Sequence, residues 1–137
     1  FMPAPYVLWD GSLNAGSKSN LNSYIMSGAV TVERLKNCFS YITFVFTLNG
    51  NKVLQKCRYD SASSKEYSFN LSNLSNTITT TSGDIQHFEL RLTLTDTNIT
   101  YTVQNGINMH ILSDSSIQAT TPASNNLTLT SIELTKQ

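Results

Sequence analysis

The segment 38–59, CFSYITFVFTLNGNKVLQKCRY, constrains the fold more than any other part of the chain. Two runs rich in aromatic and β-branched residues meet at Asn49-Gly50, a strong short signal for a two-residue type I′ turn. Such a turn places Leu48 opposite Asn51, so the numbers of facing residues sum to 99. The segment therefore predicts an antiparallel hairpin with a defined register, but it names no chemistry.

The same register predicts that the two cysteines, Cys38 and Cys57, do not form a disulfide. Cys57 faces Ile42, which lies four residues from Cys38, or about 13 Å along an extended strand. A disulfide needs Cα atoms within about 7 Å. We therefore expect two free thiols, both buried as small apolar groups.

The composition predicts a surface that is polar but nearly uncharged. The 137 residues have a formal net charge of zero, and only 13% are charged, whereas about 25% is typical. Ser, Thr and Asn supply 49 residues, which favours short strands joined by tight turns. No basic field for nucleic acid and no apolar run long enough for membrane insertion is visible.

Alternating apolar residues predict further strands. Phe88, Leu90, Leu92 and Leu94 alternate with polar residues up to a turn at 96–98, and Asn105-Gly106 predicts another turn before Ile107. The last strand changes parity at Thr130-Ser131, which a β-bulge explains. The pattern predicts an all-β, antiparallel β-sandwich of the jelly-roll kind with about eight or nine short strands. Residues 1–5 are expected to be a linker from a longer chain, and 6–137 a single β-sandwich domain.

Catalytic and metal-binding patterns are weak. His87 and His110 lie in different predicted strands without ligands at metal spacing, so structural roles are expected. The acidic residues are scattered, so the sequence predicts no enzyme, no metal and no cofactor. Trp9 either closes one end of the core or offers a sugar-stacking platform, and the core role is the stronger expectation.

Several short motifs occur in order along the chain. They are Leu8-Trp9-Asp10-Gly11, Gly28–Val32, Leu35-Lys36-Asn37, Tyr41–Phe46 and the closing Leu127–Ile132. This order resembles the receptor-binding or tail-fibre tip (head) domains of bacteriophages, mainly over residues 6–50. The resemblance implies a homotrimeric head at a fibre tip, in the virion and outside the cell, that attaches to a host surface glycan or protein without a cofactor.

Candidate contact residues follow from polar-tipped aromatics and exposed amides near predicted loops. The loops are expected at 14–20, 60–65 and 113–126. The candidate receptor-binding residues are Tyr59, Asp60, Tyr67, Asn105, Asn108 and Asn125. Tyr59, Tyr67 and Tyr101 are expected to be exposed.

The half-apolar second faces of two hairpins suggest a trimer interface. Its candidate residues are Val45, Leu54 and Tyr101. The ordinary alternative is that these side chains face the second sheet.

Three other function classes remain open. A monomeric carbohydrate-binding module of a secreted bacterial enzyme would present a flat aromatic platform. A structural virion protein, such as a capsid decoration or an animal-virus fibre knob, would share the fold. An enzyme ranks last and would need a cleft with two carboxylates at hydrolase spacing.

Overall fold

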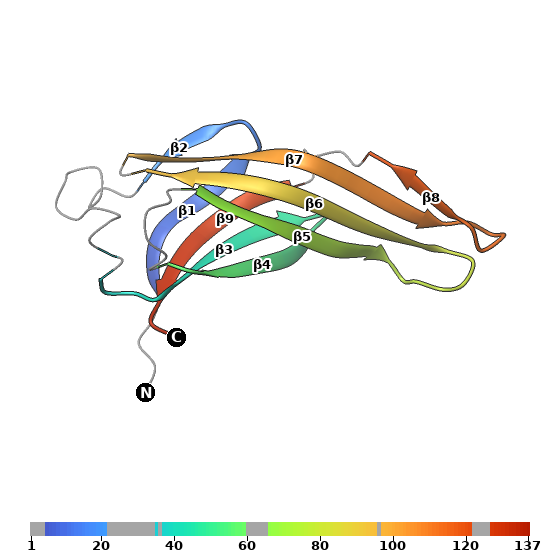
Figure 1. The fold of residues 1–137 in the computed structure, drawn as a ribbon, viewed down its shortest axis with the longest axis horizontal. Helices are drawn as coiled ribbons and strands as arrows, with labels where there is room; N and C mark the ends of the chain where they lie inside the picture. Colours follow the sequence, from blue (N-terminus) through green and yellow to red (C-terminus); the bar gives the residue numbers. More distant parts are fainter. Residues whose placement is uncertain (1–4, 22–34, 36, 60–65, 96, 122–126) are drawn as a thin grey trace.

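Two antiparallel sheets form the molecule (Figure 1). The computed structural model describes residues 5–21, 35, 37–59, 66–95, 97–121 and 127–137, and for 74–76 the backbone alone. One sheet has the order β1 (Tyr6–Asn14), β9 (Leu127–Thr135), β3 (Tyr41–Leu48) and β4 (Asn51–Arg58). The other has the order β2 (Lys18–Asn20), β7 (Asn98–Ile111), β6 (Gly83–Leu94) and β5 (Glu66–Asn76), with β8 (Ile117–Thr120) also paired to β7.

The all-β sandwich expected from the sequence is confirmed, with nine strands in the described residues. Of the expected linker 1–5, only Pro5 is described, and the motif Gly28–Val32 lies outside the described residues. Tyr6 pairs with Leu134, so the start of β1 and the end of β9 lie side by side.

The hairpin of β3 and β4 has the predicted register at every paired position. Leu48 faces Asn51 and Ile42 faces Cys57. Asn49 and Gly50 have φ values of 51° and 80°, as a type I′ turn requires. Asn tolerates and Gly favours positive φ, so this dipeptide fits the two-residue turn, and the apolar alternation of the flanking strands agrees with the same register.

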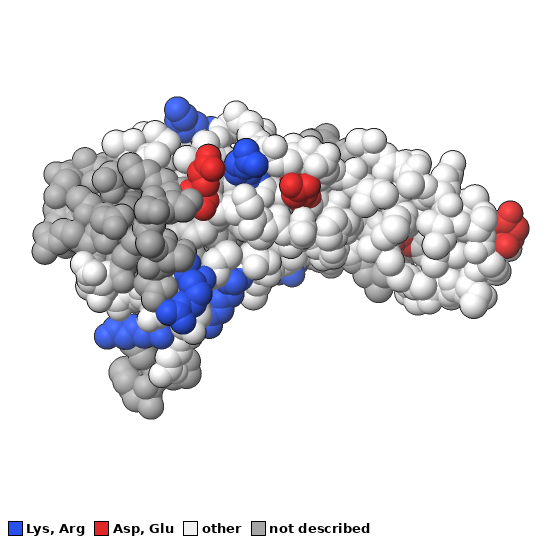
Figure 2. All heavy atoms as spheres, in the orientation of Figure 1, with Lys and Arg blue, Asp and Glu red and all other residues white. Residues whose placement is uncertain are grey.

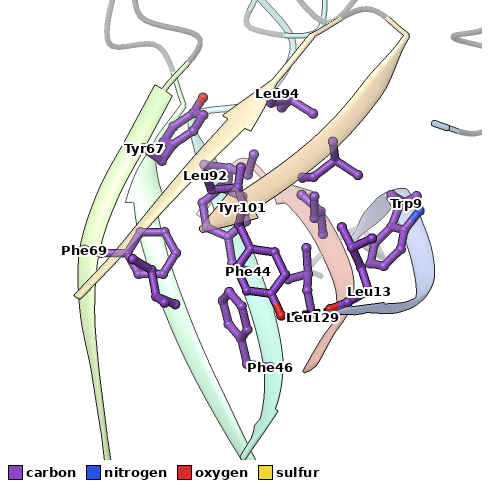
Figure 3. Packing of buried hydrophobic residues seen from close by; sticks show 14 of the residues in the cluster. Trp9, Leu13, Phe44, Phe46, Tyr67, Phe69, Leu92, Leu94, Tyr101 and Leu129 are labelled. Carbon is purple, nitrogen blue, oxygen red and sulfur yellow. Dashed lines mark hydrogen bonds between the residues drawn. The ribbon is translucent and has the colours of Figure 1, made fainter. Parts of the chain in front are cut away.

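Aromatic side chains join the two sheets (Figure 3). Phe44 of β3 stacks on Phe69 of β5, with ring centroids 5.3 Å apart, and meets the edge of Tyr67 at 5.2 Å. Phe46 packs edge-to-face on Tyr101 of β7 at 5.5 Å. Each such pair contributes about 0.5–1.5 kcal/mol beyond the burial of its area.

Trp9 belongs to this core, so the expected core role is confirmed over the sugar-stacking platform. Its side chain is buried, and its indole N–H donates to Ser19 Oγ at 3.0 Å. Gly11, with φ of +153°, lies under the ring, and a Cβ there would come within 3.0 Å of it. Asp10-Gly11, which follows the short apolar run 6–9, predicts a turn, but register shifts between Val7 and Trp9 and between Asp10 and Leu13 let β1 continue to Asn14 as a bulged strand.

Two other expectations about strand ends are wrong. Asn105-Gly106 is not a turn, because β7 runs through it without positive φ and Gly106 pairs with Phe88. The sequence predicts a short strand over 67–71 before the polar passage 72–84, but β5 extends from Glu66 to Asn76 and β6 begins at Gly83. The bulge expected in β9 is confirmed: Thr130 is skipped between Leu129 and Ser131 in the pairing with β3.

Tyr101 connects both sheets through its hydroxyl. Its side chain is 1% exposed, and the hydroxyl donates toward Leu13 O at 2.8 Å and Leu127 O at 3.1 Å. Burial raises the pKa of the Tyr101 phenol from 10.0 to about 12. The neutral phenol is therefore the form that the folded protein prefers.

Tyr101→Phe should lower the free energy of unfolding by about 1–3 kcal/mol, because two buried carbonyls lose a donor. The folded pKa lies above the unfolded one, so the stability from this group is present below pH 10 and lost between pH 10 and about 12. The difference between wild type and variant in urea unfolding should shrink over that range. Tyr41→Phe, on the outer face of β3, is the control, and an equal cost there would contradict the assignment.

The cysteines are unpaired, as expected, but they are not both buried. Cys38 is exposed and Cys57 is half-buried. Burial raises the pKa of the Cys57 thiol, and a long contact from Gln55 Nε2 to its sulfur at 4.0 Å opposes this. The Cys38 N–H bonds to Leu35 O at 3.0 Å, and the first cysteine lies before β3, outside the core.

A thiol-reactive chromophore should label Cys38 quickly in the native protein and Cys57 more slowly, because the thiolate is the reacting form. Cys38→Ser should remove the fast phase alone. Both thiols should react in denaturant without added reductant, and a protein that needs reductant first would show a disulfide.

Candidate functional site

The strands β5, β6 and β7 extend beyond the sheet formed by β1, β9, β3 and β4 and form a single-layer arm (Figure 1). The last row shared with the sandwich core contains Leu71 of β5 and Phe88 of β6, which face each other and are buried. We define the arm as residues 72–87 and 105–120, which include β8. The arm projects away from the end where β1 begins and β9 ends.

The arm is almost free of charge (Figure 2). Besides His87 and His110, its sequence contains only two charged residues, Asp84 and Asp114. Lys52, Lys56 and Arg58, in contrast, lie on the outer side of β4 in the body. A surface of this kind suits ligands that bind through hydroxyl and amide groups more than through ionic contacts.

On the arm, the strand positions that continue the core face carry polar residues. Phe88 and Leu90 face the sheet formed by β1, β9, β3 and β4, and alternation places Asp84 and Gln86 on the same side of β6. Asn108 and His110 face these two across β7. We call this side the inner arm face.

Asp84, His110 and Thr120 form a row across three strands of the inner arm face. Asp84 Oδ1 hydrogen-bonds to His110 Nδ1, and His110 Nε2 lies 2.8 Å from Thr120 Oγ1. A carboxylate accepts, so Nδ1 carries the proton, and Nε2 of the neutral ring accepts from the threonine hydroxyl. The row holds the imidazole in one tautomer and one orientation.

A hollow of about 640 Å³ opens beside this row, within the range of about 300–1,000 Å³ that small-molecule sites occupy. We call it the arm hollow. Residues with hydroxyls, an amide, a carboxylate and an imidazole line it, together with two aliphatic residues at the end of β7. The lining residues are Thr77, Ser82, Gly83, Asp84, His110, Ile111, Leu112 and Gln118.

Gly83 shapes one wall of the arm hollow. It has φ of +142°, and a Cβ there would meet the backbone and side chain of Ile78 at 3.0 Å. The close approach holds the turn 77–82 against the first residue of β6, and Thr79 N–H bonds to Ser82 O at 2.7 Å within that turn. Thr77 and Ser82 are thereby placed at the rim.

The base of the arm is tied to the sandwich by amides. Asn49, in the turn between β3 and β4, donates through Nδ2 to Oε1 of the buried Gln86. Asn73 donates to Leu48 O at 3.5 Å. Asn108 Oδ1 is buried without a hydrogen-bond partner among the described residues. These contacts fix where the arm leaves the body.

Two smaller hollows lie elsewhere. One, of about 130 Å³, is on the opposite face of the arm and is lined by Asn70, His87, Glu89, Asn105, Gly106 and Ile107. The other, of about 200 Å³, lies beside the buried tryptophan and is lined by Val7, Trp9, Asp10, Ser19, Asn20 and Leu21.

The structure does not bring the predicted receptor-binding residues together. Tyr59 and Tyr67 were expected to be exposed, but both are buried, at 0% and 9% exposure, so we withdraw them as contacts. Asp60 and Asn125 lie outside the described residues. Asn105 and Asn108 lie on opposite faces of β7, since their partners Glu89 and Gln86 differ in parity along β6.

The predicted trimer-interface residues also separate. Tyr101 is buried between the sheets, so its assignment to an interface is wrong and the alternative of facing the second sheet is right. Val45 and Leu54 face each other on the outer side of their sheet, where Val45 is 4% exposed and Leu54 57%. Only Leu54 offers a second chain substantial apolar surface.

Sequence reasoning missed Asp84, His110, Gln118 and Thr120 as one group. A signal was present, because Asp84 and Gln86 continue the parity of the apolar run that starts at Phe88. Polar residues at core parity indicate that the covering sheet has ended. Which strands then lie beside them depends on pairing across β7 and β8.

Metal binding and membrane spanning find no support in the part of the chain that the structure describes. No group of three or more His, Cys, Asp or Glu there is placed to hold a metal ion. None of its helices is long and apolar enough to cross a membrane.

No protein-family model, curated protein or solved structure matches this chain.

The tautomer of His110 is directly testable. In ¹⁵N-resolved spectra of the neutral imidazole, the proton should sit on Nδ1, and Asp84→Ala should shift the population toward Nε2–H, the form that a free ring prefers. His87, whose Nδ1 lies 2.5 Å from Ser72 Oγ, should be unaffected by that substitution. An Nε2–H tautomer in the wild type would contradict the row.

Proposed function

We propose that this chain is the head domain of a bacteriophage tail fibre, which attaches to a saccharide or protein on the host surface and performs no catalysis. The observation that carries this proposal is the arm hollow, a polar and nearly uncharged site. It lies at the far end of the molecule from the paired chain ends at Tyr6 and Leu134 (Figure 1). A head joined to a fibre through that end would present the arm outward.

The chemistry of the arm hollow fits a neutral saccharide. Sugar rings offer neighbouring hydroxyls, which pair with amides, carboxylates and imidazoles held in fixed directions, and apolar C–H faces, which pack on aliphatic side chains. Gln118 and His110 supply the polar groups, and Leu112, 39% exposed, supplies apolar surface. A homotrimer in the virion, as the resemblance implies, would strengthen weak single-site binding by avidity.

The carbohydrate-binding module is the weaker proposal. Its recognition would use a flat aromatic platform, yet Trp9, Tyr59, Tyr67 and Tyr101 are buried in the described structure. A structural virion protein would share the sandwich, and it would lack saccharide binding at the arm hollow.

Binding is tested with the chain coupled densely to beads and applied to an array of neutral and anionic bacterial surface saccharides. We expect neutral saccharides to bind, and Gln118→Ala or His110→Ala to lower affinity about tenfold, the effect of one lost hydrogen bond. His87→Ala, on the opposite face of the arm, is the matched control. Binding that His87→Ala abolishes and the other two variants preserve would place the site elsewhere.

Catalysis needs a separate control, because carboxylate, imidazole and hydroxyl are connected here in the order found in serine hydrolases, and Thr120 is exposed. Hydrolysis of an activated ester should be no faster with the wild type than with Thr120→Val. A rate that depends on Thr120 would contradict the non-catalytic part of the proposal.

A further inference from the structure

The apolar side of the second sheet changes where the sandwich ends. In the body, β6 turns Phe88, Leu90 and Leu92 toward the other sheet and places Glu89 and Arg91 outside. In the arm the inner positions are polar and most outer positions are aliphatic, apart from polar residues such as Ser72 and His87 where the arm begins. We call the outer side the outer arm face.

Neighbouring strands continue the outer arm face. Across β6, β7 and β8, Ile85 faces Met109 and Met109 faces Ala119, while Ile111 faces Ile117 in the next row. Ile107 lies on the same side of β7. The outer arm face consists of Ile85, Ile107, Met109, Ile111, Ile117 and Ala119.

No second layer covers this face in the described structure. The sheet formed by β1, β9, β3 and β4 lies on the opposite side, where Phe88 and Leu90 point. Ile117 is 68% exposed and Ile107 38%. Aliphatic residues gathered on one exposed sheet face indicate an interaction surface.

The chemistry of the face argues for a copy of the same chain as its occupant. The outer arm face contains no Asp, Glu, Lys or Arg, and His87 borders it beside Ile107. A partner recognised through carboxylate or ammonium groups therefore finds no complement on it, while two identical faces meet without repulsion between such groups. The arm is half of a β-sandwich, and a second arm supplies what the body obtains from its other sheet, an apolar sheet face. Sheets pack in this way about 10 Å apart.

The size of the face predicts the strength of the contact. Its three strands, about 4.8 Å apart and about six residues long, span about 200–300 Å². A standard interface uses about 800 Å² of each partner. Association through the arms alone should therefore be weak and depend on protein concentration.

We propose that the outer arm faces of two or more copies of this chain pack against each other, and that this contact, rather than the body surface at Leu54, is the self-association interface. The inference goes beyond the proposed function, because the contact requires no receptor.

The test needs no ligand. The mass in solution is measured by light scattering and analytical ultracentrifugation from about 10 µM to about 1 mM, the range in which weak complexes form. The wild type should shift from the monomer mass of 15.2 kDa toward a multiple of it. Ile117→Lys and Ile107→Lys should keep the protein monomeric by placing like charges at the contact. Leu54→Lys, on the body and with an exposure between those of Ile107 and Ile117, should associate like the wild type.

Circular dichroism and the melting temperature of each variant establish that the fold is intact, and all three substitutions are at exposed positions. A wild type that stays monomeric up to 1 mM would overturn the proposal and leave the face to a different protein. Loss of association in Leu54→Lys, with retention in the two arm variants, would place the interface on the body instead.

Discussion

The aromatic contact between the sheets is the interaction on which the rest of the structure depends. Phe44 and Phe46 alternate along β3, so both rings point to the same side and meet Phe69 and Tyr101 from the other sheet. The tyrosine hydroxyl then reaches the backbone of Leu13 and Leu127, which brings the first and last strands into the same core. Five strands are held by this one group of side chains.

The arm begins where this contact stops. Beyond Phe88 the other sheet meets β6 through its β3–β4 turn, where Asn49 bonds to Gln86, and polar residues take over the positions that were apolar. Polar groups on the inner arm face can then contact water or a ligand, whereas apolar groups on the outer arm face need another cover. Both proposals, a saccharide site and a self-contact, therefore arise from one event, the ending of one sheet before the other.

Local chemistry made some elements predictable. The hairpin of β3 and β4 could be predicted to the residue because Asn49-Gly50 permits one turn geometry, and the alternation from Phe88 to Leu94 identified a buried strand face. The same dipeptide misled at Asn105-Gly106, where pairing with β6 on one side and β8 on the other keeps the backbone extended. The predicted exposure of Tyr67 and Tyr101 is wrong for a related reason. A tyrosine near a strand end is exposed only if no opposing sheet reaches it.

By itself, the sequence determined the all-β class, the register of the main hairpin, the lack of a disulfide and the low charge, because each depends on residues close in the chain or on composition. Only the tertiary structure decided that Asp84, His110 and Thr120 lie in one row, that Tyr59 and Tyr101 are buried, and that one face of the arm is left uncovered. These features depend on which distant strands pair and on how far each sheet extends. The pairing of distant strands depends on many weak contacts between residues far apart in the chain, so a local sequence pattern cannot predict it.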